Sequence, residues 1–186
     1  MNETLTKEQI KTIFSICRQS IESKLSEKYE KTKVEDFPLL HEKRGVFVTL
    51  KINERLRGCI GNLFTEEELH VSLKDMARSS AFSDPRFSAL TKDEYQNVDI
   101  EVSILSPMEK ITNIDEIQIG THGIVVSKGY NKAVFLPQVA VEQKWDRDEF
   151  LSNCCLKAYL PPNAYKDKDI IIEVFTADIF DEKELD

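Results

Sequence analysis

Residues 45–61 read GVFVTLKINERLRGCIG, and this stretch decides the fold class. Its first half alternates apolar and polar side chains, which predicts a half-buried strand from Gly45 to Ile52. A turn is expected at Asn53-Glu54-Arg55, and a short segment punctuated by glycines follows from Leu56 to Leu63. Strands that arrive as hairpin neighbours in this way favour an antiparallel sheet.

Helices are predicted where apolar residues recur at helical spacing. Thr6 is expected to cap the first helix, in a capping box with Gln9. The second helix is expected to begin at Thr65, with Glu68 three residues later completing a second capping box. It must stop by Ser83, because a proline follows two residues later and restricts the residue before it to extended geometry.

The remaining elements follow from alternation and turn residues. A third helix is expected to begin at Asp146 and to end before Pro161. The charged stretch from Glu27 to Glu35 is interpreted as a solvated connector, and the tail from Asp181 to Asp186 as an acidic, frayed end. Further strands are predicted at Val98–Leu105, at Gly123–Lys128 and Lys132–Leu136 around the turn Gly129-Tyr130-Asn131, and at Asp169–Ile179.

The order of these elements lacks the regular strand-helix-strand cadence of a doubly wound sheet. We therefore predict an α+β fold, with a mainly antiparallel sheet and flanking helices. A chain of 186 residues, of which 41% are hydrophobic, is long enough to bury one core without disulfides or metals. One domain over residues 1–186 is expected.

Charge and hydropathy exclude several classes of function. The chain has 25 basic and 33 acidic residues, which gives a net charge of −8. A surface this acidic does not bind nucleic acid through phosphate contacts, and it is not attracted to an anionic membrane leaflet. The longest apolar runs are too short to cross a bilayer, and the N-terminal residues lack the pattern of a signal peptide. A cytoplasmic protein is the expectation.

The four cysteines are Cys17, Cys59, Cys154 and Cys155. None belongs to a Cys-x-x-Cys pair, so zinc-ribbon and thioredoxin-type sites have no support. Neighbouring cysteines such as Cys154 and Cys155 form strained bridges, and all four are expected to be reduced thiols. Cys17 lies on the apolar stripe of the first helix and is expected to pack in the core.

The segment Arg57-Gly58-Cys59-Ile60-Gly61 carries the strongest chemical signal. If it is extended, Arg57 and Cys59 share one face, so the guanidinium favours thiolate over thiol. Gly58 and Gly61 allow a ligand or another backbone to approach the main chain, and free N–H groups there could hold an anion. The alternative is a glycine-bent strand with a buried, inert cysteine, and spacing alone leaves both open.

The segment Leu56–Gly61 resembles the signature of the AMMECR-one domain family, known in prokaryotes as AmmeMemoRadiSam system protein A. The similarity continues over nearly the whole chain, through Ser80–Phe87, Glu101–Leu105, Gly120–Ile124, Leu136–Ala140, Trp145-Asp146 and Lys157-Ala158. It implies a two-lobed α+β domain with a cleft around which the motif residues gather, so that residues 1–186 are one such domain with two sublobes. It also implies a shared pathway with Memo-like and radical-SAM-type partners, and it names no reaction.

His122 is a second catalytic candidate, because glycines flank it and it belongs to a matching motif. Near Cys59 it would act as a general base or an ion-pair partner; the alternative is an ordinary loop histidine. Glu101 lies on the polar face of its strand, where it could orient His122, bind substrate or simply be solvated. A metal held by Cys59, His122 and Glu101 lacks any local ligand spacing, so no metal site is predicted.

The other candidate binding residues lie within the remaining motifs. Asp84 and Arg86 flank a proline, and they either recognise a carboxylate or phosphate or form an internal ion pair that fixes the loop. Ser80 could donate or cap locally, and no nucleophile elbow surrounds it. Gln138 and Lys157 either line a cleft or lie on the surface. His41 and His70 are expected to be exposed, and no phosphate-binding loop or dinucleotide fingerprint indicates a cofactor.

Two functions follow from these residues. In the first, the protein is a small enzyme in which Cys59 attacks an electrophilic carbon or carries a transferred group, with Arg57 stabilising the thiolate and His122 moving protons. In the second, it is a non-catalytic regulatory module that binds a small anionic ligand or a partner's peptide through Arg57, Arg86, Lys157 and the glycine backbone. Cys59 then only packs.

Overall fold

The computed structural model describes residues 5–26 and 36–185. These residues divide into two compact units. Unit 1 holds the described residues up to Leu105 and those from Asp178 onward, and unit 2 holds Ser106–Ala177. Each unit has its own four-stranded sheet and its own buried core. The predicted connector at 27–35 and the last residue of the predicted tail lie outside the described residues.

Unit 1 is built on a sheet with the strand order β2-β1-β3-β8. Strand β1 is antiparallel to both of its neighbours, as the hairpin pattern predicted. Asn53 and Glu54 form the turn between β1 and β2 with positive φ angles of 51° and 61°, the conformation of a tight two-residue hairpin. The four strands are β1 (Val46–Ile52), β2 (Arg55–Asn62), β3 (Asp99–Leu105) and β8 (Ala177–Asp181).

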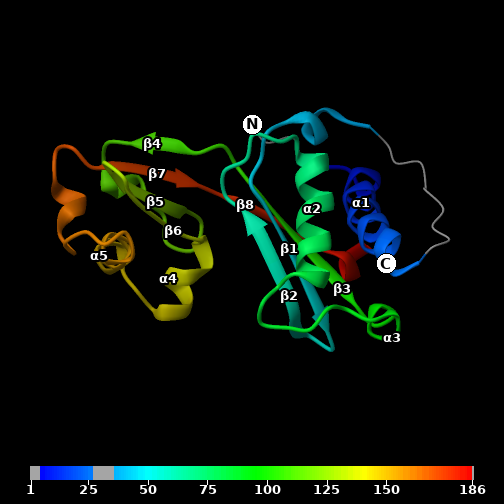
Figure 1. Ribbon diagram of the computed structural model, residues 1–186. Coiled ribbons are helices and arrows are strands. Elements are labelled where there is room, and N and C mark those ends of the chain that lie inside the picture. Colours follow the sequence, from blue (N-terminus) through cyan, green and yellow to red (C-terminus); the bar gives the residue numbers. More distant parts are fainter. Residues whose placement is uncertain (1–4, 27–35, 186) are drawn as a thin grey trace. The chain divides into compact units, whose positions relative to one another are not determined.

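Two long helices, α1 (Lys7–Leu25) and α2 (Leu69–Phe82), lie on one side of this sheet (Figure 1). Helix α2 packs on β1 and β2, and α1 packs against α2. The alternate residues predicted to point inward are fully or almost fully buried in this layer, as is Cys17, except that Ile52 at the end of β1 is only partly buried. The inward-pointing residues of β1 and β3 are Val46, Val48, Leu50, Ile100, Val102 and Ile104.

The predicted start of the second helix is wrong. Thr6 caps α1 in a capping box with Gln9, as expected, but α2 begins at Leu69 with Glu68 as its N-cap residue. The Thr65 hydroxyl instead accepts a hydrogen bond from the N–H of Glu67 at 2.9 Å, which closes a local turn before the helix. The side chain of Glu68 makes no cap hydrogen bond. The predicted end of the helix by Ser83 is confirmed.

Short helical segments complete unit 1: η1 (Pro38–His41), α3 (Lys92–Tyr95) and η4 (Glu182–Leu185). The last of these corrects the prediction of a frayed tail. Asp181 belongs to β8, and the Glu182 carboxylate pairs with Arg18 at 2.6 Å and accepts a hydrogen bond from the N–H of Ile100 at 3.3 Å. Pairing with a helix residue early in the chain fixes the end of the described chain.

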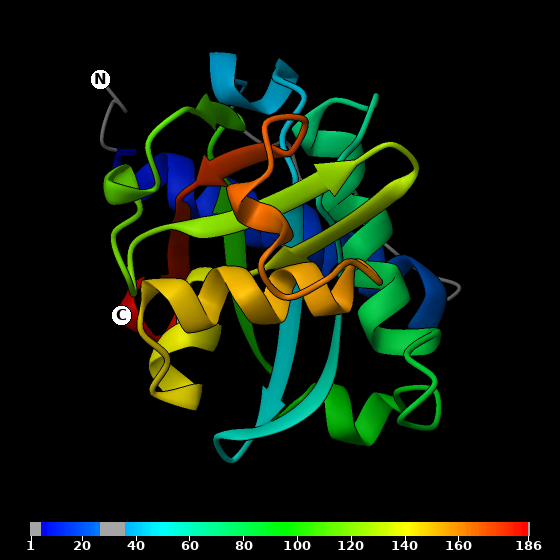
Figure 2. The ribbon, with the colours of Figure 1, turned by 90° about the vertical axis from the view of Figure 1, so that its left-hand side faces the viewer.

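Unit 2 has the strand order β4-β7-β5-β6. Its hairpin, β5 (Gly123–Lys128) and β6 (Asn131–Phe135), is antiparallel and matches the predicted strands closely. Helix α5 (Arg147–Lys157) runs beside this hairpin (Figure 2). It begins at Asp146 as predicted, with a capping box between Asp146 and Glu149. The other elements are β4 (Glu109–Ile111), β7 (Ile171–Phe175), α4 (Pro137–Gln143), η2 (Ile114–Glu116) and η3 (Ala164–Lys166).

The final strand predicted at Asp169–Ile179 is in fact two strands in two different sheets. Strand β7 ends at Phe175 and β8 begins at Ala177. The residue between them, Thr176, makes two backbone hydrogen bonds with Ser106 instead. Its N–H donates to the Ser106 hydroxyl and its C=O accepts from the Ser106 N–H, both at 2.9 Å. These bonds replace sheet pairing at the break, and nothing in the apolar alternation signals them.

The α+β class with antiparallel sheets is confirmed. The predicted cleft between two lobes stays a prediction. No helix in the described part of the chain is both long enough and apolar enough to cross a bilayer.

Gly58 marks a close approach between α2 and the sheet of unit 1. A Cβ atom at this position would overlap the backbone carbonyl oxygen of Ser80. Backbone cannot swing aside as a side chain can, so a larger residue must push α2 away from β2. The glycine is therefore required by packing, whatever its neighbours do chemically.

We expect Gly58→Ala to lower the free energy of unfolding by about 1 to 3 kcal/mol, the usual cost of overpacking. Urea titration followed by circular dichroism measures the loss. Gly129→Asn is the matched control, because Gly129 has a φ of 60°, which asparagine tolerates, and nothing lies within 4 Å of an added Cβ. Equal stability of the two variants would contradict the close contact.

Candidate functional site

The segment around Cys59 is held in place by residues at the C-terminal end of α2. The Ser80 hydroxyl accepts a hydrogen bond from the N–H of Ile60 at 2.8 Å and donates one to the carbonyl of Val48 at 2.7 Å. Val48 and Ile60 are direct partners in the ladder, so the hydroxyl bridges β1 and β2. Ser80 is 1% exposed, which makes it a structural bridge and not a group that a ligand can reach.

Asp84, just beyond the helix, binds the backbone of Cys59 directly. Its carboxylate accepts the N–H of Cys59 at 2.8 Å, and it also accepts three hydrogen bonds from Arg86, the shortest from Nη2 at 2.7 Å. The same Nη2 donates to the carbonyl of Cys59 at 3.2 Å. Together the pair grips both the N–H and the C=O of the cysteine, which is the internal ion pair weighed as one alternative.

Asp84 and Arg86, which we call the Cys59 clamp, differ in their exposure to solvent. The Asp84 side chain is 1% exposed, and the Arg86 guanidinium, followed by the Cys59 N–H, holds the pKa of that carboxyl well below its usual range. The Arg86 side chain is 53% exposed, so its outer edge faces solvent. Asp84 is therefore an ionised structural group, whereas Arg86 can still meet an anion from outside.

Arg57 does not lie where simple alternation predicts. The ladder between β1 and β2 shifts register between Leu50 and Lys51, which pair with Gly58 and Leu56. Arg57 is therefore the extra residue of a β-bulge, and a bulge re-aims the side chain that it carries. The expectation that its guanidinium flanks the thiol rested on unbroken alternation.

The Arg57 guanidinium is bound elsewhere. Its Nε donates to Glu94 at 2.9 Å and its Nη2 donates to the carbonyl of Ser88 at 3.0 Å. This contact lowers the pKa of Glu94 to about 2. Because the ion pair uses the guanidinium, Arg57 is a structural cation that holds α3 against β2.

Cys59 itself lies on the sheet face opposite α2. It pairs across the ladder with Thr49, and Thr49 pairs in turn with Glu101, so the three residues form a row across β2, β1 and β3. The Thr49 hydroxyl donates to the Cys59 sulfur at 3.2 Å. Thr49, and not Arg57, is therefore the side chain that contacts the sulfur.

Glu101 is engaged by a lysine on the neighbouring strand. Lys51 Nζ lies 2.7 Å from its carboxylate and 3.7 Å from that of Asp181, and the contact with Glu101 raises the pKa of Lys51. The side chains of Lys51 and Glu101 are 23% and 25% exposed. We refer to Cys59, Thr49, Glu101 and Lys51 as the polar row.

Cys59 differs from the other three cysteines in exposure. All four are free thiols, but Cys17, Cys154 and Cys155 are buried, whereas Cys59 is half-buried. Burial raises the pKa of Cys17 and Cys155, and it raises that of Cys154 to about 12. The sulfur of Cys59 is therefore the one that a reagent in solution can reach most readily.

The remaining predicted residues, His122, Gln138 and Lys157, belong to unit 2. The Nδ1 of His122 accepts the N–H of Gln118 at 3.2 Å, so the neutral ring carries its proton on Nε2. Lys157 donates to the carbonyl of Val134 at 2.9 Å, and its ammonium lies 4.6 Å from the centre of the Phe135 ring. Gln138 is exposed in the first turn of α4. Their roles at a site with Cys59 stay predictions.

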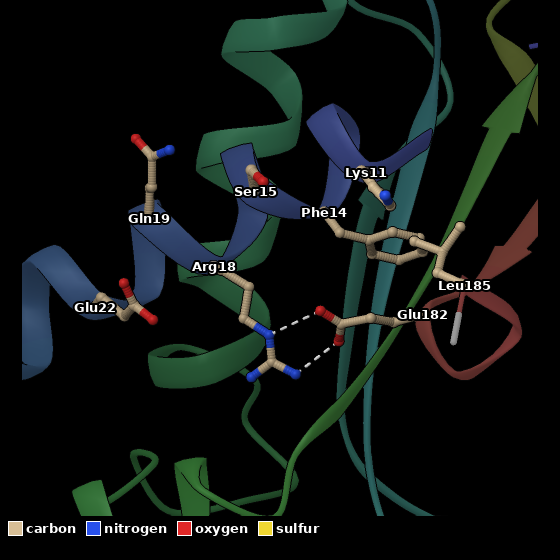
Figure 3. Close-up of a pocket in the computed structure, with 8 residues that line it drawn as sticks. All are labelled: Lys11, Phe14, Ser15, Arg18, Gln19, Glu22, Glu182 and Leu185. Atoms are coloured by element: carbon tan, nitrogen blue, oxygen red, sulfur yellow. Dashed lines mark hydrogen bonds and ion pairs between the residues drawn. The ribbon is translucent and has the colours of Figure 1, made fainter. Parts of the chain in front are cut away.

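A hollow of about 450 Å³ between α1 and the C-terminal segment was missed by sequence reasoning (Figure 3). The Arg18–Glu182 pair spans it, with the guanidinium bidentate on the carboxylate. The two partners lie 164 residues apart, so no local pattern could reveal them. This pair neutralises its own charge. The hollow is lined by Lys11, Phe14, Ser15, Arg18, Gln19, Glu22, Glu182 and Leu185.

The comparisons with known proteins agree with the motifs around Cys59. The AMMECR1 family model matches residues 14–180. The chain belongs to the AMMECR1 family. Similar curated proteins occur in archaea: one of Methanosarcina mazei is 39% identical over 98% of this chain and 96% of its own length. One of Methanosarcina barkeri is 41% identical over 97% and 93%.

A protein of known crystal structure is also similar to this chain. The uncharacterised protein PH0010 from Pyrococcus horikoshii has a TM-score of 0.75 and 38% sequence identity, with coverage of 92% of this chain and 90% of that one. The resemblance inferred from the LRGCIG segment is thus confirmed. The names of these relatives state no activity, so the chemistry must be argued from this chain's own residues.

We expect Asp84→Asn to lower the free energy of unfolding at pH 7 by about 1.5 to 3 kcal/mol, the range for hydrogen bonds to a charged group. The folded pKa of Asp84 is depressed, so its stabilisation is complete above the unfolded pKa of about 3.9 and is lost as the pH falls through the folded value. The difference between wild type and variant should therefore shrink below about pH 4.

Urea unfolding at pH 7, 5 and 3.5 measures this difference. Asp75→Asn is the matched control, because Asp75 lies exposed on α2. A gap between wild type and Asp84→Asn that stays constant down to pH 3.5 would show that Asp84 does not act through its charge.

Proposed function

We propose that the protein takes part in the modification of a small molecule or a protein, with Cys59 as its reactive group. One observation carries this proposal: the most accessible thiol of the chain is also the residue whose backbone is gripped by Asp84 and Arg86. A structural cysteine needs no such clamp. Reactive groups benefit from it, because a fixed nucleophile loses less entropy when it meets its substrate.

The proposed step is nucleophilic attack by the Cys59 sulfur on an electrophilic carbon. An S–C bond forms, the bond from that carbon to its leaving group breaks, and the leaving group departs with the electron pair. The proton released by the thiol passes to a base and then to the leaving group; His122 is the proposed carrier. The hydrogen bond from the Thr49 hydroxyl holds the sulfur in place before the attack.

The partners are proposed from family membership alone. AmmeMemoRadiSam-type proteins are grouped with Memo-like and radical-SAM-type proteins, so the product of this chemistry would be made or used by one of them. The substrate would carry an anionic group, because the exposed edge of Arg86 lies next to the Cys59 backbone. A cytoplasmic location stays a prediction.

A second candidate function has its own support. Arg57, two residues from Cys59, and Arg86, which binds its backbone carbonyl, are each paired with a carboxylate, so neither is available to activate the thiol by itself. This arrangement suits a non-catalytic module that binds an anionic ligand or partner peptide over the polar row. Cys59 would then contribute packing alone.

The rate of alkylation separates the two functions. We expect iodoacetamide to modify Cys59 faster than the three buried cysteines, because its sulfur is the most accessible one. Thr49→Val should slow the modification of Cys59 because it removes the hydrogen bond that fixes the sulfur, and peptide mass spectrometry assigns each site. Thr91→Val is the matched control, since the Thr91 hydroxyl caps α3 instead.

A Cys59 that reacts no faster than the buried cysteines, at a rate that Thr49→Val leaves unchanged, would rule out an activated thiol and favour the binding module. His122→Gln tests the proposed proton carrier in the same assay, since removal of an imidazole that pairs with the thiol changes the rate of alkylation. Cys59→Ser then gives the direct comparison. Intact binding of a Memo-like partner with lost pathway output supports catalysis, and unchanged output supports the module.

A further inference from the structure

A second cluster of chemically capable side chains lies at the opposite end of α2 from the Cys59 clamp. His41 ends η1, Glu68 is the N-cap residue of α2, and His70 lies in its first turn. The helix runs for about 18 Å between His70 and Phe82, at 1.5 Å per residue. The chain has three histidines, and two of them meet here although 29 positions separate them. Both histidines were expected to be exposed, but His70 is half-buried.

The atoms of this cluster are already spaced as metal ligands are. Glu68 Oε2 lies 2.8 Å from His41 Nδ1 and 3.2 Å from His70 Nδ1. One ligand atom from each side chain falls within 4.8 Å of the others. Zinc bonds of about 2.0 to 2.2 Å in tetrahedral geometry put neighbouring ligand atoms about 3.3 Å apart, so little movement is needed.

Asp36 supplies an outer-shell partner. Its carboxylate lies 2.7 Å from His41 Nε2, on the far side of the ring from Glu68. A histidine that binds a metal through one nitrogen almost always donates the other N–H to a carboxylate or carbonyl, which fixes the ring and its tautomer. His41 has this arrangement, with Nδ1 toward Glu68 and Nε2 toward Asp36.

The segments that carry the cluster are tied to each other. The N–H of Leu69 donates to the carbonyl of Glu42 at 2.8 Å, and both Leu40 and Leu69 are buried in the core of unit 1. His70 Nδ1 also lies 3.1 Å from the carbonyl of Leu40, to which it donates, so the proton on this nitrogen must leave when an ion binds there. The ligand side chains thus project from anchored backbone, which holds a site in the geometry that it needs.

The Glu68 side chain is engaged by the cluster and not by the helix that it begins. The side chains that ordinarily accept an N–H of the first turn are those of Ser, Thr, Asp and Asn, and the longer Glu68 side chain makes no such bond. Its carboxylate is turned instead toward the two imidazoles. The nearby cation Lys43 pairs with Glu66 at 2.7 Å, which leaves the carboxylates of Glu68 and Asp36 to balance a cation in the cluster.

We propose that His41, Glu68 and His70 form a binding site for one divalent cation of the zinc class, with Asp36 as its outer-shell partner. Two imidazole nitrogens and one carboxylate oxygen suit Zn²⁺, Ni²⁺ or Co²⁺, whereas Ca²⁺ and Mg²⁺ prefer sites built of oxygen. The side chains of His41, Glu68 and His70 are 52%, 45% and 30% exposed, so water can complete the coordination. The site is independent of the function proposed for Cys59.

Metal binding by the full chain tests this site. All proteins carry Cys59→Ser, so that the accessible thiol cannot bind the ion, and are treated with chelator and titrated with Zn²⁺ against a chromogenic competitor at pH 8. That pH limits competition from protons at the histidines. We expect one ion per chain with a Kd in the micromolar range or below. His41→Ala and His70→Ala should each weaken it by about 100-fold or more, and Asp36→Asn by about 10- to 100-fold.

The controls are Glu66→Gln, a nearby exposed carboxylate, and His122→Gln, the one histidine outside the cluster; both should bind Zn²⁺ as the parent does. Glu68→Gln keeps the shape of its side chain and should also weaken binding, which guards against misfolding of the alanine variants. Co²⁺ should give the visible spectrum of a four-coordinate site, and this spectrum should be lost in His70→Ala. Binding that needs millimolar Zn²⁺, or that survives both histidine variants, would overturn the site.

Discussion

The close contact between α2 and the edge strand β2 is the constraint on which the Cys59 segment depends. Gly58 leaves room for the backbone of Ser80, the Ser80 hydroxyl bridges β1 and β2, and Asp84 follows directly beyond the helix. These contacts act on consecutive residues of β2, so the strand cannot slide or twist without breaking several of them. Sheet edges ordinarily leave N–H groups unpaired; here the edge N–H of Cys59 is bound to a buried carboxylate.

Much of the fold could be predicted because short-range patterns determine it. Alternation predicted the buried faces of β1 and β3, a capping box predicted the start of α1, and Asp146 was expected to begin α5. The errors occur where distant residues decide the local backbone. The break at Thr176 depends on Ser106, and the ordered C-terminal segment depends on Arg18, and neither partner lies within reach of a sequence window.

The sequence was enough to find Cys59 as the central residue of the candidate site, but not to predict which side chains contact it. Cys59 stood out through its glycine-framed motif, and the pairing of Asp84 with Arg86 was one of the alternatives weighed. The bulge at Arg57 was not foreseen, and it sends the expected activator to Glu94 while Thr49, an ordinary strand residue in the sequence, reaches the sulfur. The register of a strand determines on which face of the sheet each side chain lies, and one extra residue in a bulge changes that assignment.

The wrong start of α2 and the histidine cluster have the same origin. Thr65 and Glu68 have the spacing of a capping box, so local chemistry alone would begin the helix at Thr65. Instead the helix begins at Leu69, and the carboxylate expected to cap it faces His41 and His70. A residue that forgoes a favourable local bond must be compensated by something else, and natural proteins break local rules mainly at functional or strained sites. Without a bound cation, the contacts of Glu68 with His41 and His70 would stabilise the fold only slightly, because ion pairs exposed to solvent contribute little. A cation shared among the three side chains supplies the larger stabilisation that the departure from the local rule requires.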